Sequence, residues 1–399
     1  MGIIVVMSST AASVTQLSSS KKAFTLIGTI IAQFALGSVY TWSLFNAAIA
    51  QELHVDAYRV ALTFGLCCFM LALTSSQAGY IEKTIGLRYT TIISAFLMFI
   101  GLYIAAHATN LIGIYIGAGI LIGIAEGSVY LMSLTNCVKI FPQKKGLISS
   151  LAVGAYGLGG VAFKYINYDL LVAYGLQKAF LYWGIIVFVL LILSAFMMFN
   201  APQEQNRSNY TLGEVLSHKS YWGFAVIFLM TCMTGLYVIG AAKDIGESMA
   251  GLDASTAANA VAILTFFNLC GRLVMGSASD KIGTLKSVRI CQIILCFGVA
   301  LICYPELNMV LFFIAIACVA FGFGGSITVY PPLIGDFFGI KNVTKNYGFI
   351  YLGFGIGSVC GNVISFVLNG FQKTLPVLVL SMILALVIVM LTKNKLHQE

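Results

Sequence analysis

Apolar stretches long enough to cross a membrane recur along the chain, and short polar segments separate them. A membrane helix needs about 20 consecutive apolar residues, whereas a barrel strand needs about 10 residues of alternating character. The pattern therefore predicts an all-α membrane protein with twelve transmembrane helices. In the first half we expect helices at residues 24–48, 58–80, 88–107, 111–138, 146–168 and 178–199. In the second half we expect them at 221–246, 256–278, 286–304, 307–336, 345–369 and 375–391.

A polar segment divides the predicted helices into two sets of six. We therefore predict two six-helix bundles, at residues 23–199 and 220–392, joined by a cytoplasmic linker at 200–219 whose second half forms a short surface helix. Residues 1–22 open with an apolar run that is too short to span a membrane and lacks the basic start of a cleaved signal. We interpret 1–22 and 393–399 as flexible cytoplasmic tails.

The composition excludes a soluble protein. Hydrophobic residues make up 59% of the chain and charged residues 9%, whereas about 25% of residues are charged in a typical soluble domain. The net charge of +8 is compatible with nucleic-acid binding. However, the basic residues lie in short loops and form no patch with interleaved aromatic side chains. We expect a lipid bilayer as the environment and no nucleic-acid partner.

Basic residues are distributed unevenly between the two sides of the predicted membrane protein. Four lie on one side, Lys164 and Arg272 lie within spans, and the other sixteen of the 22 lie on the side of the two termini. Loops retained in the cytoplasm are enriched in Lys and Arg. The asymmetry therefore predicts that both termini are cytoplasmic.

The sequence offers no grouping of residues for catalysis or metal binding. The ten cysteines form no C-x-x-C pair and lie mostly within predicted spans, and the four histidines fall in loops or tails. No Ser/His/Asp or Cys/His set can be assembled, and no phosphate-binding loop lies between a strand and a helix. We expect no metal, no cofactor and no enzymatic activity.

An internal repeat relates the two halves. The segments 79–86 and 276–283 both begin and end with glycine between two predicted spans, at an offset of 276 − 79 = 197 residues. Tyr40 and Tyr237 have the same offset, and Tyr156-Gly157-Leu158-Gly159 is similar to Phe354-Gly355-Ile356-Gly357 at an offset of 198. Parallel halves of this kind place a binding site between them. The repeat therefore predicts alternating access to a central site.

These features resemble the major facilitator superfamily over the whole chain. Its characteristic loop, G-x-x-x-D-[RK]-x-G, is matched by Gly276, Asp280, Lys281 and Gly283. The first-half copy keeps Gly79 and Gly86, but Lys83 stands in place of the acid and Glu82 precedes it. The resemblance implies the major facilitator fold, with two pseudo-symmetric bundles, and a role for both loops as a conformational gate.

Three segments resemble the oxalate/formate antiporter family, whose members carry small carboxylates. They are G-S-V-Y-T-W-S at 37–43, G-x-x-x-G-x-x-Y at 123–130 running on to F-P-x-x-K-G at 141–146, and N-Y-G at 346–348. Within this family the chain is most similar to an enterobacterial branch of transporters for pyruvate-like monocarboxylates, through residues 34–46 and 345–348. The resemblance implies a bacterial inner-membrane protein.

Arg272 is the strongest candidate for binding an anion. It lies in an apolar span about one turn before the end of that span, and a charged side chain at this depth must face a polar cavity, find a partner or bind an anion. Its guanidinium can form two parallel hydrogen bonds with a carboxylate, which a lysine cannot. The alternative is a structural arginine that snorkels to the inner surface.

Several aromatic residues are further candidates for the substrate site. The resemblance implies that Tyr40, Trp42, Tyr130 and Tyr330 line one cavity, and the repeat adds Tyr237 as the counterpart of Tyr40. A tyrosine supplies an apolar wall and a hydroxyl group for a small acid. The alternative for each aromatic is ordinary helix packing or a place in the membrane interface.

Phe354 bears on the choice of substrate. In the oxalate carriers the family pattern places a lysine before the glycine of span eleven, where this chain has Phe354. A doubly charged oxalate in a poorly solvated cavity needs about two compensating cations. Arg272 alone suits one carboxylate, with Phe354 as an apolar wall against the methyl end of a substrate such as pyruvate.

Glu126 lies about midway along the fourth predicted span. At this depth a carboxyl group is protonated, paired or in contact with water. It is either the group that takes up a coupled proton or the fixed partner of a cation. Lys164 falls near the outer end of span five, where snorkelling explains it adequately.

We therefore predict a secondary transporter that carries small monocarboxylates by alternating access, driven by protons or by exchange, and that works as a monomer. The alternatives left open are an oxalate/formate-type exchanger, a drug exporter, and a sensor that binds a carboxylate without transporting it.

Overall fold

The computed structural model describes residues 17–55, 57–202, 210–368 and 370–392. Within these ranges the chain is helical and contains no strand, which confirms the all-α fold class. Most of the two predicted tails lies outside the described residues. Helix α1 begins at Ser19, a few residues earlier than predicted, because the Ser18 side chain caps it by accepting a hydrogen bond from the Lys21 N–H.

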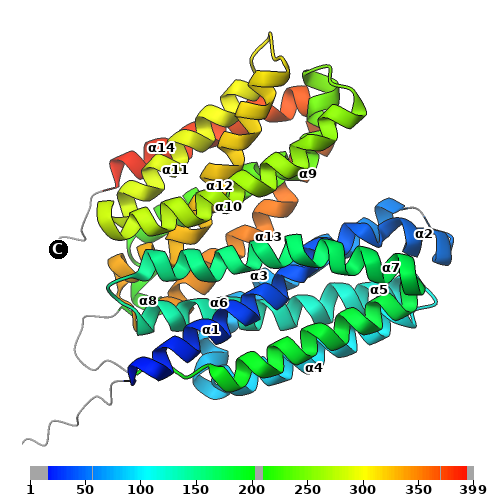
Figure 1. The fold of residues 1–399 in the computed structure, drawn as a ribbon. Helices are drawn as coiled ribbons and strands as arrows, with labels where there is room; N and C mark the ends of the chain where they lie inside the picture. The colour runs from blue at the N-terminus through cyan, green and yellow to red at the C-terminus, as the bar shows by residue number, and fades with distance from the viewer. Residues whose placement is uncertain (1–16, 56, 203–209, 369, 393–399) are drawn as a thin grey trace, which may run out of the picture.

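The helices follow one another in the order predicted (Figure 1). The first half contains α1 (Ser19–Leu36), α2 (Asn46–Leu53), α3 (Ala57–Thr84), α4 (Leu87–Ala106), α5 (Leu111–Ile114), α6 (Ile122–Ile140) and α7 (Lys145–Met197). The second half contains α9 (Lys219–Met249), α10 (Ala254–Ile282), α11 (Thr284–Ile302), α12 (Met309–Phe338), α13 (Val343–Leu368) and α14 (Phe371–Leu391).

Helix α7 contains two membrane spans. Eleven helices of the described part are long and apolar enough to cross a membrane. One of them is α7, whose 53 residues would extend about 80 Å as a straight helix, against about 30 Å for a bilayer core. Its backbone leaves the helical conformation at Gly175, with φ of 77° and ψ of 174°. Counting its two limbs, residues 145–174 and 176–197, as separate spans gives the twelve predicted.

Two spans that we predicted as continuous α-helices contain irregular turns. The first changes to a 3₁₀ helix at Gly37–Leu44, and the fourth contains a π-helical stretch at Tyr115–Leu121. A change of helix type rotates every later side chain about the axis relative to an α-helix. The faces of these two spans therefore cannot be read from a simple 3.6-residue period.

The linker helix is shorter than predicted. Helix α8 covers Leu212–Val215 and begins with a capping box, in which the Thr211 N–H donates to the Glu214 carboxylate at 2.6 Å. This hydrogen bond holds the pKa of Glu214 below its usual value. The end of the linker is attached to the second half, because the Tyr210 carbonyl oxygen accepts hydrogen bonds from the side-chain amides of Asn342 and Asn346 at 3.0 and 3.1 Å.

The spans form two bundles. In the first bundle α7 packs against α1 and α4, and in the second α12 packs against α10 and α11. The bundles touch mainly through α3 with α13 and through α7 with α10. Figure 1 shows that α1 begins and α14 ends at the same end of the molecule as α8. We call this end the linker side and the opposite end, where the ribbons of the bundles diverge, the far side.

Two equivalent glycines form the turns of the repeated loops. Gly86 lies between α3 and α4 and has φ of 80°, and Gly283 lies between α10 and α11 and has φ of 92°. Residues with a β-carbon rarely adopt this conformation, whereas glycine does so readily. The turn geometry therefore explains why glycine ends both copies of the repeated loop.

Candidate functional site

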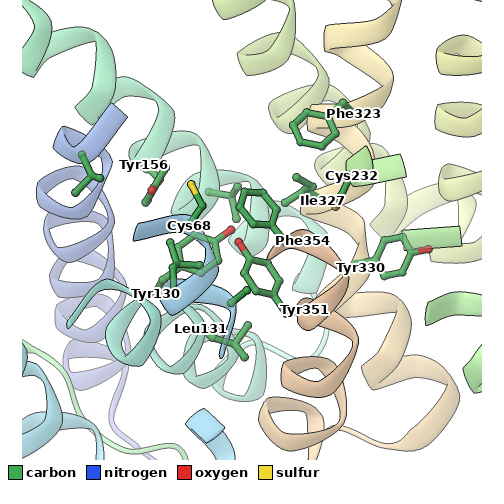
Figure 2. Packing of buried hydrophobic residues seen from close by; sticks show 14 of the residues in the cluster. Cys68, Tyr130, Leu131, Tyr156, Cys232, Phe323, Ile327, Tyr330, Tyr351 and Phe354 are labelled. Carbon is green, nitrogen blue, oxygen red and sulfur yellow. The ribbon is translucent and has the colours of Figure 1, made fainter. Parts of the chain in front are cut away.

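A cavity lies between the two bundles near the middle of the membrane spans. The first bundle contributes Val39, Tyr40, Phe64, Cys68, Leu71, Glu126, Tyr130 and Tyr156. The second bundle contributes Arg272, Ile327, Tyr351 and Phe354. Figure 2 shows Tyr130, Tyr156, Cys68, Tyr351 and Phe354 converging on this region. The free volume of the cavity is about 10 Å³, room for roughly one water molecule, so a larger ligand needs the surrounding side chains or bundles to move apart.

Arg272 points into this cavity and not to the surface, and it lies ten residues before the end of α10 instead of about one turn before it. Only 4% of the residue is exposed, which argues against the snorkelling alternative. Its Nη1 donates to the Val153 carbonyl oxygen of the first bundle at 2.7 Å, and its own carbonyl oxygen accepts from the Ser150 hydroxyl at 2.9 Å. Its Nε has no hydrogen-bond partner among the described residues. A buried charged donor left unpaired is unfavourable, which makes this atom a candidate position for binding a ligand.

Glu126 lies on the same cavity and is 1% exposed. Its carboxyl group accepts hydrogen bonds from the Tyr156 hydroxyl and, at 3.7 Å, from the Cys67 thiol. Both partners are neutral groups. Of the two alternatives for Glu126, a proton-accepting carboxyl therefore fits these contacts better than the fixed partner of a cation.

Four tyrosines line the cavity, two of which we did not predict. Tyr40 and Tyr130 both meet Tyr156 edge to face, with ring centroids 5.0 and 5.3 Å apart, and Tyr130 lies 5.5 Å from Tyr351 of the other bundle. Tyr351 stacks on Phe354 with ring centroids 5.2 Å apart. The repeat held a signal for Tyr156, because it is the counterpart of Phe354. Tyr351 lies one turn before Phe354 on α13 and follows from no motif.

Three aromatic residues expected at the cavity lie elsewhere. Trp42 stacks on Phe180, with ring centroids 5.8 Å apart, inside the first bundle. Trp42 lies two residues after Tyr40 in a 3₁₀ helix, so its side chain points in a different direction from that of Tyr40. Tyr330 donates to the Phe224 carbonyl oxygen at 3.1 Å, and Figure 2 shows it apart from the tyrosines of the cavity.

Tyr237 does not occupy the position of its repeat counterpart, Tyr40. Its hydroxyl lies 2.8 Å from that of Ser365 within the second bundle. The physical reason is that α9 continues as an α-helix through this region, whereas the first span changes to a 3₁₀ helix at Gly37. Lys164 also lies away from the cavity, with its Nζ 5.7 Å from the Tyr165 ring centroid and its side chain exposed.

The repeated loop of the second half holds the two bundles together on the linker side. The Asp280 carboxylate accepts hydrogen bonds from the Gly146 and Leu147 N–H groups at 2.7 and 2.8 Å. These N–H groups belong to the first turn of α7, which attracts negative charge. Gly276 lies so close to Gly146 that a β-carbon on it would collide with the Gly146 carbonyl oxygen and the Ser150 hydroxyl. Lys281, next in the loop, is exposed.

A second contact between the two bundles lies on the linker side. Lys145 forms an ion pair with Asp336, and the Thr284 hydroxyl donates to the same carboxylate at 2.8 Å. In the loop of the first half, a β-carbon on Gly79 would collide with the Lys345 backbone. There Glu82 pairs with Lys139 at 2.6 Å inside the first bundle. Among the described residues, charged contacts between the bundles come from the second-half loop, from α12 and from Arg272, whereas the acid beside Lys83 pairs within its own bundle.

Among the described residues, no group of three or more His, Cys, Asp or Glu side chains is placed to hold a metal ion. The described residues that line the cavity supply one guanidinium, one carboxyl group, the Cys68 thiol, tyrosine hydroxyls and apolar walls.

Comparison with known proteins agrees with the fold. The family description "Major Facilitator Superfamily" matches residues 25–243 and 223–395. An Escherichia coli protein, the uncharacterized MFS-type transporter YhjX, is 51% identical over 343 residues, which cover 84% of this chain and 85% of the relative. The oxalate:formate antiporter of Oxalobacter formigenes is 27% identical over 339 residues, covering 82% and 79%.

A solved structure has the same fold. The transporter FucP in its outward conformation superposes with a TM-score of 0.70 at 15% sequence identity, over 93% of this chain and 100% of that chain.

We predict that Asp280→Asn weakens closure on the linker side. The substitution removes the negative charge that Asp280 places beside the first turn of α7. The interaction of such a charge with a helix N-terminus is typically worth about 0.3–1 kcal/mol. Spin labels at positions 143 and 282, one on each bundle, would report a larger fraction of long distances in the variant. Glu82→Gln is the control, because its ion pair lies within one bundle. Identical distance distributions in Asp280→Asn and the parent would contradict the prediction.

Proposed function

Because the chain belongs to the major facilitator superfamily and is therefore a membrane transporter and not an enzyme, we propose that it carries small monocarboxylates such as pyruvate across the bacterial inner membrane. One observation carries the proposal: Arg272 is a buried cation with an unpartnered Nε, in a cavity shared by the two bundles. A buried charge without compensation is strongly unfavourable. The cavity therefore favours an anionic ligand.

The hydrogen bonds of Arg272 leave one edge of its guanidinium for the proposed anion. Its Nη1 is already engaged by the Val153 carbonyl oxygen. The substrate carboxylate accepts two parallel hydrogen bonds from the other edge of the guanidinium, through Nε and Nη2. The Tyr156 hydroxyl is engaged by Glu126, so the other tyrosines of the cavity would contact a second polar group, such as the keto oxygen of a 2-oxo acid.

The charges and walls of the cavity favour one carboxylate over two. Of the described residues that line it, Arg272 is the one cation. A dianion would bring a second negative charge toward Glu126, without a second cation to compensate it. Phe354 and Ile327 instead offer an apolar surface, and burying one methyl group against such a surface is worth on the order of 1 kcal/mol.

The relatives support a carboxylate as the substrate class. One is named for the exchange of oxalate and formate. The buried guanidinium disfavours the lipophilic cations that drug exporters carry, because like charges repel in a poorly solvated cavity. A sensor that binds the acid without moving it is the remaining alternative, and it is distinguished by binding without counterflow in proteoliposomes.

We propose that Glu126 couples transport to protons. With a carboxylate bound to Arg272, an ionised Glu126 would leave the cavity with a net negative charge, whereas a protonated Glu126 would leave it neutral. Substrate and proton therefore favour each other's binding, and this relation is reciprocal. Tyr156 holds the Glu126 carboxyl group in place through its hydroxyl. Exchange of one acid for another needs no such proton.

The two bundles provide alternating access. Contacts at Asp280 and Asp336 close the linker side in this conformation. The proposed substrate would therefore enter the cavity from the far side. We propose that the bundles comprise residues 23–199 and 220–392 and that the linker comprises 200–219. Both termini lie in the cytoplasm, and the loops 79–86 and 276–283 form the gate on the cytoplasmic face. The cavity is complete within one chain, which supports function as a monomer.

The first prediction of this proposal concerns Arg272. Arg272→Lys keeps the positive charge but loses the planar pair of donors, so binding of pyruvate should weaken by about tenfold or more. Uptake of labelled pyruvate into proteoliposomes measures it. Arg289→Lys is the matched control, because Arg289 also donates to backbone carbonyl oxygens but does not line the cavity. Uptake by Arg272→Lys at the parent rate would show that Arg272 is structural.

The second prediction concerns coupling. Glu126→Gln keeps the shape of the side chain but cannot exchange a proton, so uptake driven by an imposed pH gradient should be lost while exchange of internal for external pyruvate is retained. Tyr156→Phe should impair gradient-driven uptake less, because it removes only one hydrogen bond to Glu126. A normal response of Glu126→Gln to the pH gradient would rule out this residue as the proton carrier.

The third prediction concerns substrate ranking. Phe354→Lys adds a second cation to the cavity, so monocarboxylates should bind more weakly and the relative affinity for oxalate should rise. Competition of unlabelled acids against labelled pyruvate measures the ranking in both proteins. Phe354→Leu keeps an apolar wall and should leave the ranking unchanged. Tighter binding of oxalate than of pyruvate by the parent would overturn the charge argument.

A further inference from the structure

A second hollow, separate from the central cavity, lies on the linker side of the first bundle. It has a volume of about 650 Å³ and is bounded by the start of α1, the turn between α6 and α7, and Pro202. We call it the basic groove, because three lysines, Lys22, Lys139 and Lys144, lie along it. The function proposed above does not use this groove.

The lysines of the groove differ in how their charges are satisfied. Lys139 forms an ion pair with Glu82 at 2.6 Å. Nearby, Lys21 lies over the Phe199 ring, 5.5 Å from its centroid. For the side chains of Lys22 and Lys144 no partner is found among the described residues, and Lys22 is half-buried. The groove therefore presents two cationic groups that are available to an anion.

The rest of the groove is apolar. Its walls include Leu26 of α1 and Ile140, Leu147, Ile148 and Leu151 of α6 and α7. Elsewhere on α1, Phe24 and Ile27 are exposed on the outer surface, at 52% and 48%. A ligand that fills this groove must carry negative charge at one end and hydrocarbon at the other.

The groove lies at the level of the membrane boundary. The first membrane span begins at Ser19, three residues before Lys22, and another begins at Lys145, directly after Lys144. Lysine side chains at the ends of spans extend toward the head-group region. Lipid phosphates and the upper parts of acyl chains occupy this level.

We propose that the basic groove binds an anionic phospholipid, with its phosphate between Lys22 and Lys144 and an acyl chain along Leu26, Ile148 and Leu151. Charge complementarity supports a lipid head group, and the apolar walls of the groove support a lipid over free phosphate. Basic hollows between membrane helices on the cytoplasmic side recognise anionic head groups in this way. The bound lipid would join the start of α1 to the start of α7.

The test measures lipid binding to the purified full-length protein in detergent by native mass spectrometry. Phosphatidylglycerol and phosphatidylcholine with the same acyl chains are the two probes. The parent should bind phosphatidylglycerol more tightly. The double variant Lys22→Gln/Lys144→Gln should weaken that binding by about 25-fold, since one lysine near a membrane surface contributes about fivefold.

The control variant is Lys219→Gln/Lys286→Gln, which removes two exposed lysines from the linker side of the other bundle. It should stay within about twofold of the parent, because distant surface charges contribute little to one bound head group. Melting temperatures of all three proteins confirm that each is folded.

Three results would overturn the proposal. The first is equal binding of the two lipids by the parent. The second is an equal loss of binding in the groove and control variants. The third is displacement of phosphatidylglycerol by inorganic phosphate at matched concentration, which would identify a site for free phosphate. None of these results depends on transport of a monocarboxylate, so the two proposals fail independently.

Discussion

The buried guanidinium of Arg272 is the constraint on which the rest of the structure depends. A charge at this depth in a membrane is tolerated only where the protein or a ligand compensates it. The protein supplies part of the compensation through the Val153 carbonyl oxygen of the opposite bundle, and leaves Nε unpaired. The same side chain therefore joins the two bundles and, in the proposed function, gives the cavity between them its preference for anions. Proposed substrate binding and proposed movement of the bundles both act through this residue.

The closure of the linker side shows how a duplicated fold becomes asymmetric. Both repeated loops keep the glycines that their turns and close contacts require. Only the second-half loop keeps the acid of the family pattern. This acid, Asp280, accepts hydrogen bonds from the first turn of α7. In the first half Glu82 is turned inward to Lys139. The bundles are thus held together by charge at one pseudo-symmetric position and by packing at the other.

The sequence was sufficient to predict the helical class, the twelve spans and the repeat, because these depend on apolar length and on glycine spacing. Five of the residues that it singled out do line one cavity: Arg272, Tyr40, Tyr130, Glu126 and Phe354. It failed for Tyr237, because the change to a 3₁₀ helix at Gly37 rotates one span and not its counterpart. It also failed for Trp42 and Tyr330, which pack inside their own bundles against Phe180 and the Phe224 carbonyl oxygen. Tyr351 could not be predicted, because its place depends on how α13 packs against α6 of the other bundle.

The most direct test of the central claim compares binding of pyruvate with binding of its neutral amide, pyruvamide, to the purified protein by isothermal titration calorimetry. The two compounds have almost the same shape and apolar surface, so they differ mainly in the charge that Arg272 is proposed to recognise. The account predicts saturable binding of pyruvate and at least about tenfold weaker binding of the amide, because a charged hydrogen-bonded pair is lost. Equal affinities for the two compounds, or no binding of pyruvate, would contradict it.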